Sequence, residues 1–264
     1  MQGSMKARRR LWRASFGILP GHCVLCRAAS LQKLDLCRPC VAKLPRLGPH
    51  CHSCAAPLPL AETDPGPGKS GLRCGRCQIK PPRFDTVRTP YLYAPPLDGL
   101  LSRFKFNSDL VAGKLLGELL ANELRTSFYL GQTSHSSKPG LPDWMIPIPL
   151  HWRRHLSRGF NQARVLADSL ADTLHIPVAD GLIKRNKATQ AQRQLRRNER
   201  SKNVEHAFTL ASRRAGTTIE GQNFAVVDDI VTTGSTAEAV AELLKQHGAA
   251  AVDIWAVART RLEN

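Results

Sequence analysis

Residues 224–236 read Phe-Ala-Val-Val-Asp-Asp-Ile-Val-Thr-Thr-Gly-Ser-Thr. The four apolar residues at the start predict a buried strand, and two acids stand at its carboxyl end. The Thr, Gly and Ser residues that follow predict a loop that opens a helix. Open α/β sheets bind ligands at the carboxyl ends of their strands, where a strand is followed by a helix. This stretch therefore predicts both an α/β sheet and the place of its ligand site.

The loop has the chemistry of a phosphate site. Gly234 permits close approach of the backbone, and the free amides at a helix start carry partial positive charge. Hydroxyl donors come from Thr232, Thr233, Ser235 and Thr236. Asp228 and Asp229 can accept hydrogen bonds from sugar hydroxyls or steady a hydrated Mg²⁺. A phosphorylated ribose satisfies both halves of this motif.

A purely structural interpretation of the same residues is a tight strand-to-helix turn, in which Asp is a local cap and Thr and Ser satisfy backbone donors. It explains any one of these residues well. It explains their order less well, because two adjacent carboxylates at a strand end repel each other and need a compensating cation or ligand.

The chain around this motif alternates between strand and helix patterns. β-branched and aromatic residues predict a strand over 87–93. The other predicted strands are 144–148, 224–227 and 252–257, and the predicted helices are 97–104, 110–128, 160–174 and 236–247. Residues 131–142 form a polar linker pattern. Such alternation predicts a parallel sheet covered by helices.

The cysteines form a second pattern, because all eight fall into four CxxC pairs. The pairs are Cys23/Cys26, Cys37/Cys40, Cys51/Cys54 and Cys74/Cys77. Two such pairs can present four thiolates tetrahedrally, so the count predicts two structural zinc ions. A disulfide framework is the rival interpretation, but the absence of an export signal favours a reducing compartment. With every ligand supplied by protein, this zinc has no open position for catalysis.

The order of the cysteine pairs leaves the zinc topology open. Pairing first with second and third with fourth gives two consecutive ribbons, whereas first with third and second with fourth gives a cross-brace. The insert at 55–73 is rich in Pro and Gly and predicts a loop. His22, His50 and His52 flank the cysteines, but eight sulfurs already fill eight positions, so we interpret these histidines as bystanders.

Charge sets the class of partner. The 264 residues carry 38 Lys and Arg against 21 Asp and Glu, a net charge of +17. This predicts polyanionic partners: nucleic acid, phosphorylated metabolites or an anionic membrane face. No apolar run approaches the ~20 residues of a membrane-spanning helix. Arg13 also interrupts the apolar stretch at 11–19 that would resemble a signal peptide.

The motifs resemble a known family. Residues 226–236 are similar to the phosphoribosyl-diphosphate (PRPP) binding motif of type I phosphoribosyltransferases. The segments 147–151 and 158–162, the four CxxC pairs and several later residues resemble the ComF family of competence-associated proteins. Those later residues are Thr189, Gln192, Leu195, Arg200, Asn203 and Phe208. The resemblance extends from Cys23 to Val257, which is nearly the whole chain.

The resemblance implies an α/β fold with a type I phosphoribosyltransferase-like parallel sheet flanked by helices, preceded by a small Cys-rich module. The expected limits are a basic arm at 1–20, a double zinc ribbon at 21–80 and a phosphoribosyltransferase-like domain at 83–264. Asp228 and Asp229 would hold the ribose 2′ and 3′ hydroxyls, and residues 232–236 would take the 5-phosphate. The remaining residues expected at the PRPP site are Pro149, Leu150, His151, Arg158, Asn161 and Arg200.

The densest basic run, residues 184–202, corresponds to the mobile hood that closes over the sugar in type I transferases. A solvated helix face and a nucleic-acid track are the alternatives for this run. Few aromatic residues accompany these cations, so base stacking has little support here.

Two functions follow. The first is a Mg²⁺-assisted transferase in which an unidentified acceptor displaces pyrophosphate from PRPP, linked to DNA uptake in natural competence. The second is an adaptor for single-stranded DNA or a partner protein, with a PRPP site used for sensing. Both place the chain in the cytoplasm, with other competence proteins at the inner membrane as further partners.

Overall fold

The computed structural model describes residues 21–30, 34–59, 71–130, 140–150, 156, 158–186, 207–211 and 218–261. The chain divides into two compact units, residues 1–44 and residues 45–264. This division falls between the first and the second pair of CxxC motifs. The domain limits expected from the sequence, at residues 80–83, follow the end of the cysteine motifs. The division at residue 44 follows the packing of the chain instead.

Within residues 21–30 and 34–44, the described part of the first unit, two CxxC motifs are accompanied by two short strands and one short helix. Strand β1 (Gly21–His22) pairs antiparallel with β2 (Ala29–Ser30), and helix α2 (Arg38–Ala42) carries the second CxxC motif. The turn between the strands closes through Cys23 N–H, which donates to the Ala28 carbonyl at 2.8 Å. Arg27 adopts the left-handed region in this turn, with φ of 63°.

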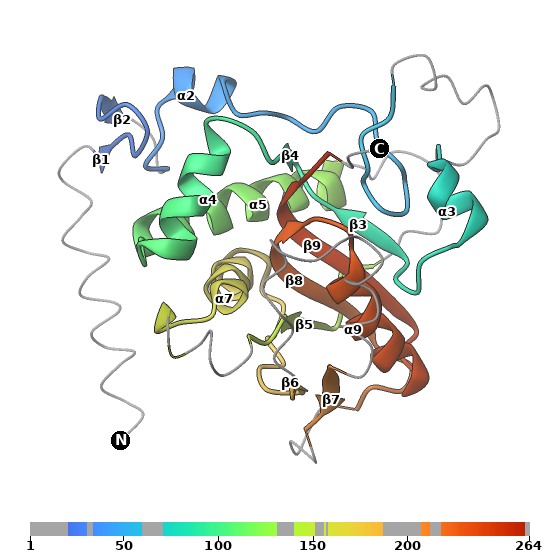
Figure 1. Cartoon of the computed structure of the whole chain (residues 1–264). Helices are drawn as coiled ribbons and strands as arrows, with labels where there is room; N and C mark the ends of the chain where they lie inside the picture. The colour runs from blue at the N-terminus through green and yellow to red at the C-terminus, as the bar shows by residue number, and fades with distance from the viewer. Residues whose placement is uncertain are drawn as a thin grey trace, which may run out of the picture. The chain divides into compact units, whose positions relative to one another are not determined.

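The second unit is built on a parallel sheet in the strand order β3-β9-β8-β5, with β4 also paired to β9 (Figure 1). The strands are β3 (Thr86–Arg88), β4 (Tyr91–Leu92), β5 (Trp144–Pro147), β8 (Asn223–Val231) and β9 (Ala251–Arg259). The sheet positions its ligand edge by register: Trp144 lies opposite Phe224, and Asp228 lies opposite Ala256.

Helices cover both faces of this sheet. The helices are α3 (Gly75–Ile79), α4 (Leu97–Phe106), α5 (Leu110–Leu130), α7 (Gln162–Leu174) and α9 (Ser235–Gln246). Helices α4, α5 and α7 pack together against β5, β8 and β9, and α9 packs on the other side of β8 and β9 (Figure 1). The predicted parallel sheet with flanking helices is confirmed. Among the described residues, no helix is both long and apolar enough to cross a membrane.

Two features of the second unit differ from the sequence-based expectation. The strand predicted at 224–227 continues to Val231, so the acid pair lies inside β8 and not after its end. It continues because β9 offers paired backbone along the whole of β8, as in the pairing of Val231 with Arg259. A small antiparallel pair, β6 (Ile183–Arg185) with β7 (Phe208–Leu210), was also not predicted.

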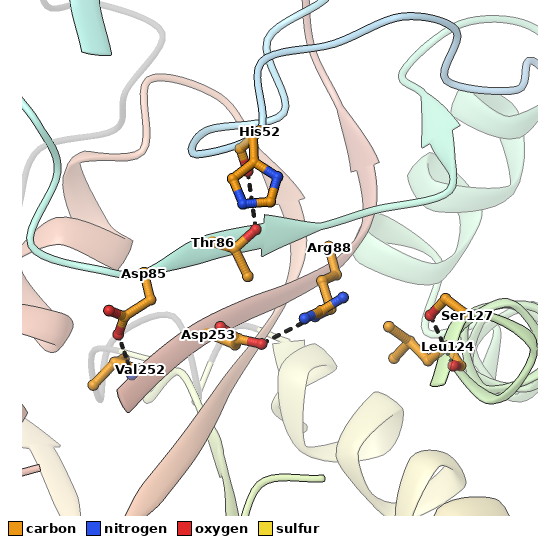
Figure 2. A network of polar contacts seen from close by, with 8 residues as sticks. All are labelled: His52, Asp85, Thr86, Arg88, Leu124, Ser127, Val252 and Asp253. Atoms are coloured by element: carbon orange, nitrogen blue, oxygen red, sulfur yellow. Dashed lines mark hydrogen bonds and ion pairs between the residues drawn. The ribbon is translucent and has the colours of Figure 1, made fainter. Parts of the chain in front are cut away.

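The segment that carries Cys51, Cys54, Cys74 and Cys77, here called the second cysteine module, covers the outer edge of the sheet at β3. The Val87 amide donates to the Ser53 carbonyl at 3.0 Å, and Thr86 Oγ1 donates to the His52 carbonyl at 3.0 Å (Figure 2). At the opposite edge, residues 177–179 lie along β5: the Met145 amide donates to the Pro177 carbonyl at 2.9 Å. Both outer strands therefore form hydrogen bonds with a neighbouring segment of the chain.

Candidate functional site

A polar pocket lies at the carboxyl ends of β8 and β5, where the sequence predicted the ligand site. We call it the aspartate pocket; its cavity has a volume of about 120 Å³. It is lined by Lys105, Ile148, Leu150, Arg158, Asn161, Gln162, Ala163, Arg185 and residues 228–237. The structure thus brings together the acid pair, the Thr/Gly/Ser loop and cations from three other segments of the chain.

The acid pair has a cation of its own. Lys105 Nζ, near the end of α4, lies 2.9 Å from Asp229 Oδ2. The Asp229 side chain is only 9% exposed, so this ion pair is largely shielded from water. Sequence reasoning required a compensating charge for two adjacent carboxylates, and Lys105 supplies it. Its signal in the sequence was weak, because a lysine on an amphipathic helix is usually a surface residue.

The surroundings of Asp228 disfavour its charged form. Burial and the negative charge of Asp229 together raise the pKa of Asp228 to about 7, against the opposing effect of Lys105. The Asp229 amide donates to Asp228 Oδ1 at 2.8 Å, which also favours the charged form. Asp228 therefore changes protonation near neutral pH, and a ligand that donates hydrogen bonds or brings positive charge favours its ionised form.

The loop of residues 232–235, here called the TTGS loop, is shaped for an anion. Gly234 has φ of 82°, a left-handed conformation that glycine adopts without strain, and it is the N-cap of α9. Thr233 Oγ1 and Ser235 Oγ lie 2.8 Å apart. Gly234 has no side chain with which to cap the helix, the Ser235 amide donates to Thr233 Oγ1 at 3.4 Å, and residues 235–237 of the first turn line the pocket. Hydroxyls and the amides of a helix start are the donors with which proteins commonly bind phosphate.

Two predicted residues form the far wall of the pocket. Asn161 caps α7 by accepting from the Ala163 amide at 3.1 Å, and its Nδ2 donates to the Ile148 carbonyl at 3.0 Å. Arg158 donates to Gln162 Oε1 at 3.1 Å. Asn161 therefore fixes the loop after β5 against α7, which places Leu150 in the pocket lining.

Other predicted residues are not part of the lining. Pro149 is described and half-buried but does not line the pocket. His151 and Arg200, together with most of the basic run 184–202, lie outside the described residues. Arg185, at the start of that run, does line the pocket. Sequence reasoning counted it only as one cation of the run and did not predict its place.

The cysteines form two separate clusters, Cys23/Cys26/Cys37/Cys40 and Cys51/Cys54/Cys74/Cys77, in which all Sγ atoms lie within 4.8 Å of one another. This selects two consecutive ribbons over the cross-brace. Tetrahedral zinc with Zn–S bonds of ~2.3 Å places its sulfurs ~3.8 Å apart. Cys26 and Cys37 Sγ lie 3.6 Å apart, and Cys54 and Cys74 Sγ lie 3.7 Å apart. Both clusters therefore fit one structural zinc ion each.

A second cavity, of about 570 Å³, lies between the second cysteine module, β3 and α5. Its polar groups are largely paired within the protein (Figure 2). Arg88 Nε donates to Asp253 Oδ2 at 3.0 Å, and Asp85 Oδ2 accepts from the Val252 amide at 2.7 Å. These contacts hold β3 against β9, so we interpret this cavity as a structural feature and place the functional site at the aspartate pocket.

Comparisons with known proteins agree with this architecture. A phosphoribosyl transferase domain family matches residues 160–262, and a double zinc ribbon domain family matches residues 16–78. The chain is 34% identical over 243 residues to the DNA utilization protein YhgH of Escherichia coli (strain K12), covering 92% of this chain and 98% of that protein.

Two further relatives carry competence names. The chain is 32% identical to competence protein F of Haemophilus influenzae, covering 90% of this chain and 96% of that protein. It is 30% identical to competence protein ComFC of Bacillus subtilis, covering 90% of this chain and 94% of that protein. With its double zinc ribbon, its phosphoribosyltransferase-like sheet and these full-length relatives, the chain belongs to the ComF family.

Proposed function

We propose that the aspartate pocket binds PRPP and transfers its ribose 5-phosphate to an acceptor. The observation that carries this proposal is the joining of two half-sites in one cavity: the TTGS loop at the start of α9 and the acid pair neutralised by Lys105. A phosphate on the TTGS loop and ribose hydroxyls on the carboxylates would use both halves at once. Arg158 and Arg185 add positive charge for the pyrophosphate.

The transfer needs no covalent intermediate on the protein. The bond between ribose C1 and the pyrophosphate oxygen breaks, and pyrophosphate leaves with the electron pair. A lone pair of the acceptor forms the new bond at C1, and the acceptor then loses a proton to solvent. The protein's part is to position the two reactants and stabilise the charge that moves onto pyrophosphate. The described pocket residues offer cations, hydroxyls and amides for this task.

Magnesium fits the donor set of the pocket. Carboxylate oxygens and water are the ligands that Mg²⁺ prefers, and Asp228 and Asp229 supply carboxylates at the cavity. When bound with PRPP, the ion would neutralise part of the diphosphate charge. Lys105 and the two arginines then complete the electrostatic balance of the site from the protein side.

Calorimetric titration of the zinc-loaded protein with PRPP and Mg²⁺ tests this proposal. We expect binding, and a reduction of at least about tenfold in affinity for Asp228→Asn and for Asp229→Asn, because each loses a charged acceptor. Glu242→Gln is the matched control: it removes one negative charge from α9 outside the pocket lining. Absence of PRPP binding by the unaltered protein, or equal effects of all three variants, would contradict the proposal.

A second candidate function, binding of single-stranded nucleic acid, is favoured by an exposed aromatic ring beside Arg158, which lines the pocket. Phe106 is 61% exposed at the end of α4, and the Arg158 guanidinium lies 5.5 Å from the centre of its ring. An exposed aromatic ring beside a cation suits base stacking. The net charge of +17 and the names of the relatives, DNA utilization protein and competence protein, point the same way.

Filter binding of a single-stranded oligonucleotide across a salt series tests the second function. Phosphate contacts give an affinity that falls steeply with salt. Phe106→Ala is expected to weaken binding by about fivefold or more, since stacking contributes ~1–3 kcal/mol per base. Tyr93→Ala, which removes another exposed aromatic ring, is the control. Undetectable or salt-independent binding would remove this candidate.

A further inference from the structure

The second cysteine module forms a hydrogen bond with the backbone of the TTGS loop. Arg76 lies between Cys74 and Cys77 in the CxxC knuckle, and its Nη2 donates to the Thr233 carbonyl at 2.9 Å. This contact joins residues that are 157 positions apart in the sequence. The knuckle therefore reaches the loop directly, and Arg76 is not among the residues that line the pocket.

Arg259, at the end of β9, makes the second connection. It is 1% exposed, and its Nε donates to the Cys54 carbonyl at 3.0 Å. Its Nη1 donates to the carbonyls of Val231, at 3.0 Å, and of Thr232. One buried guanidinium thus joins a zinc knuckle of the second cluster to the first residues of the loop.

The charge of Arg259 has its counterpart in the cysteine cluster. Among the residues that the structure describes, no carboxylate lies within ion-pair distance of Arg259. Four thiolates around one Zn²⁺ carry a net charge of −2, so a metal-loaded cluster can balance a buried cation that carbonyl dipoles alone would hold poorly.

Peptide geometry makes these contacts relevant to the pocket. In a planar trans peptide, the carbonyl and the following N–H point in opposite directions. Fixing the carbonyls of Thr232 and Thr233 on the arginines therefore directs the amides of Thr233 and Gly234 away from the arginines, and both of these residues line the pocket. The arginines do not line the pocket. Their effect on a bound anion acts through the backbone of the loop.

We infer that Arg76 and Arg259 are positioning residues that join the second zinc ribbon to the phosphate-binding loop, so that metal loading of this ribbon sets the affinity of the pocket for a 5-phosphate. The inference rests on the proposed function for its ligand, a sugar 5-phosphate, but the mechanical connection does not depend on it. The first cysteine cluster lies in a separate compact unit, so we assign it no part in this connection.

The test uses the full-length, zinc-loaded protein and two readouts. The first is amide hydrogen exchange of residues 232–236, and the second is calorimetric binding of PRPP with Mg²⁺. We expect Arg76→Ala to speed loop exchange and weaken PRPP binding by about five- to tenfold, the effect of one lost charge-assisted hydrogen bond. Arg259→Lys keeps the charge but loses the branched donor, and we expect a larger change of the same kind.

Arg73→Ala is the matched control, because Arg73 is next to Cys74 and accepts a hydrogen bond from Gln78 Nε2 through its backbone carbonyl, which the substitution retains. It should leave loop exchange unchanged and PRPP affinity within about twofold. If Arg76→Ala and Arg259→Lys behave like Arg73→Ala in loop exchange, the inference is wrong. If loop exchange responds as expected but the unaltered protein binds no PRPP, the connection stands and the proposed function fails.

Discussion

The two cysteine clusters have the same ligands and different surroundings. Cys23, Cys26, Cys37 and Cys40 belong to the compact unit of residues 1–44, where the described residues form two short strands and one short helix. Cys51, Cys54, Cys74 and Cys77 fold with the parallel sheet, where three of these four side chains are buried. The same set of four cysteines therefore has two uses. In the first unit it orders a small module, and in the second unit it belongs to a module that supports the aspartate pocket.

The largest effect we expect comes from removing one ligand of each cluster in turn. Cys77→Ser should lower the melting temperature of the second unit by roughly 10 °C or more, because metal binding supplies folding free energy to the wall of the pocket. Cys40→Ser should lose one zinc ion and change the melting of the second unit by less than about 3 °C. Calorimetry with zinc analysis checks both. Equal losses in the two variants would contradict the separation of the clusters.

Zinc release should distinguish the clusters by rate. Cys26 is exposed, whereas Cys51, Cys54 and Cys77 are buried, so a chelator reaches the first cluster more easily. We expect zinc to be released in two phases of one ion each, and the rate of the slow phase to be lower than that of the fast phase by about tenfold or more. PRPP should slow only the slow phase, because ligand binding stabilises only the unit that contains the pocket. A chromogenic chelator follows both phases; a single phase, or slowing of the fast phase by PRPP, would contradict this expectation.

The acid pair should make the stability of the second unit depend on pH, with a definite sign. The pKa of Asp228 is raised from 3.8 to about 7, so between these pH values the folded state holds a proton that the unfolded state has lost. Stability therefore falls as pH rises from about 4 to 7. Asp228→Asn should raise the melting temperature by roughly 3–6 °C at pH 8 and by a smaller amount at pH 5, where only part of the fall in stability between pH 4 and 7 has occurred.

Thermal unfolding at the two pH values measures this difference. Glu242→Gln again provides the control for loss of one negative charge on the same unit, and it should show no such dependence. A loss of stability in Asp228→Asn at pH 8 would contradict the assigned sign.

The smallest effect concerns the attachment of the second ribbon to the sheet. Thr86→Val preserves shape and removes the hydrogen bond to the His52 carbonyl, so it should cost about 1 kcal/mol, or 2–4 °C in melting temperature. Thr126→Val is the control: it removes a similar hydroxyl bond, to the Asn122 carbonyl, from an exposed helix position. Equal effects would show that the attachment contributes nothing specific.

What the sequence predicted correctly depended on local pattern. The CxxC spacing predicted two four-cysteine sites, and the order of residues 224–236 predicted a strand, a loop and a helix. These features can be recognised in short windows, because the chemistry requires particular residue types at close spacing.

What the sequence did not predict depends on contacts between distant segments. Lys105 reaches Asp229 only because α4 packs beside the carboxyl end of β8, and Arg259 gains its role only where β9 meets the cysteine module. A basic residue at the end of a strand pattern carries no such information in its own neighbourhood. The division at residue 44 likewise follows from which cysteine module packs on the sheet, which spacing alone leaves undetermined.

The covering of β3 by residues 52 and 53 has a consequence for solubility under metal starvation. An uncovered outer strand offers free amides and carbonyls to any other extended chain, and such strands start edge-to-edge aggregation. The β5 margin is guarded by residues 177–179, which need no metal. The β3 edge is covered by the second cysteine module, whose four cysteines fit one zinc ion. In a zinc-poor cell, molecules would therefore have an uncovered β3 edge. These molecules would aggregate through that edge before their sheets had unfolded.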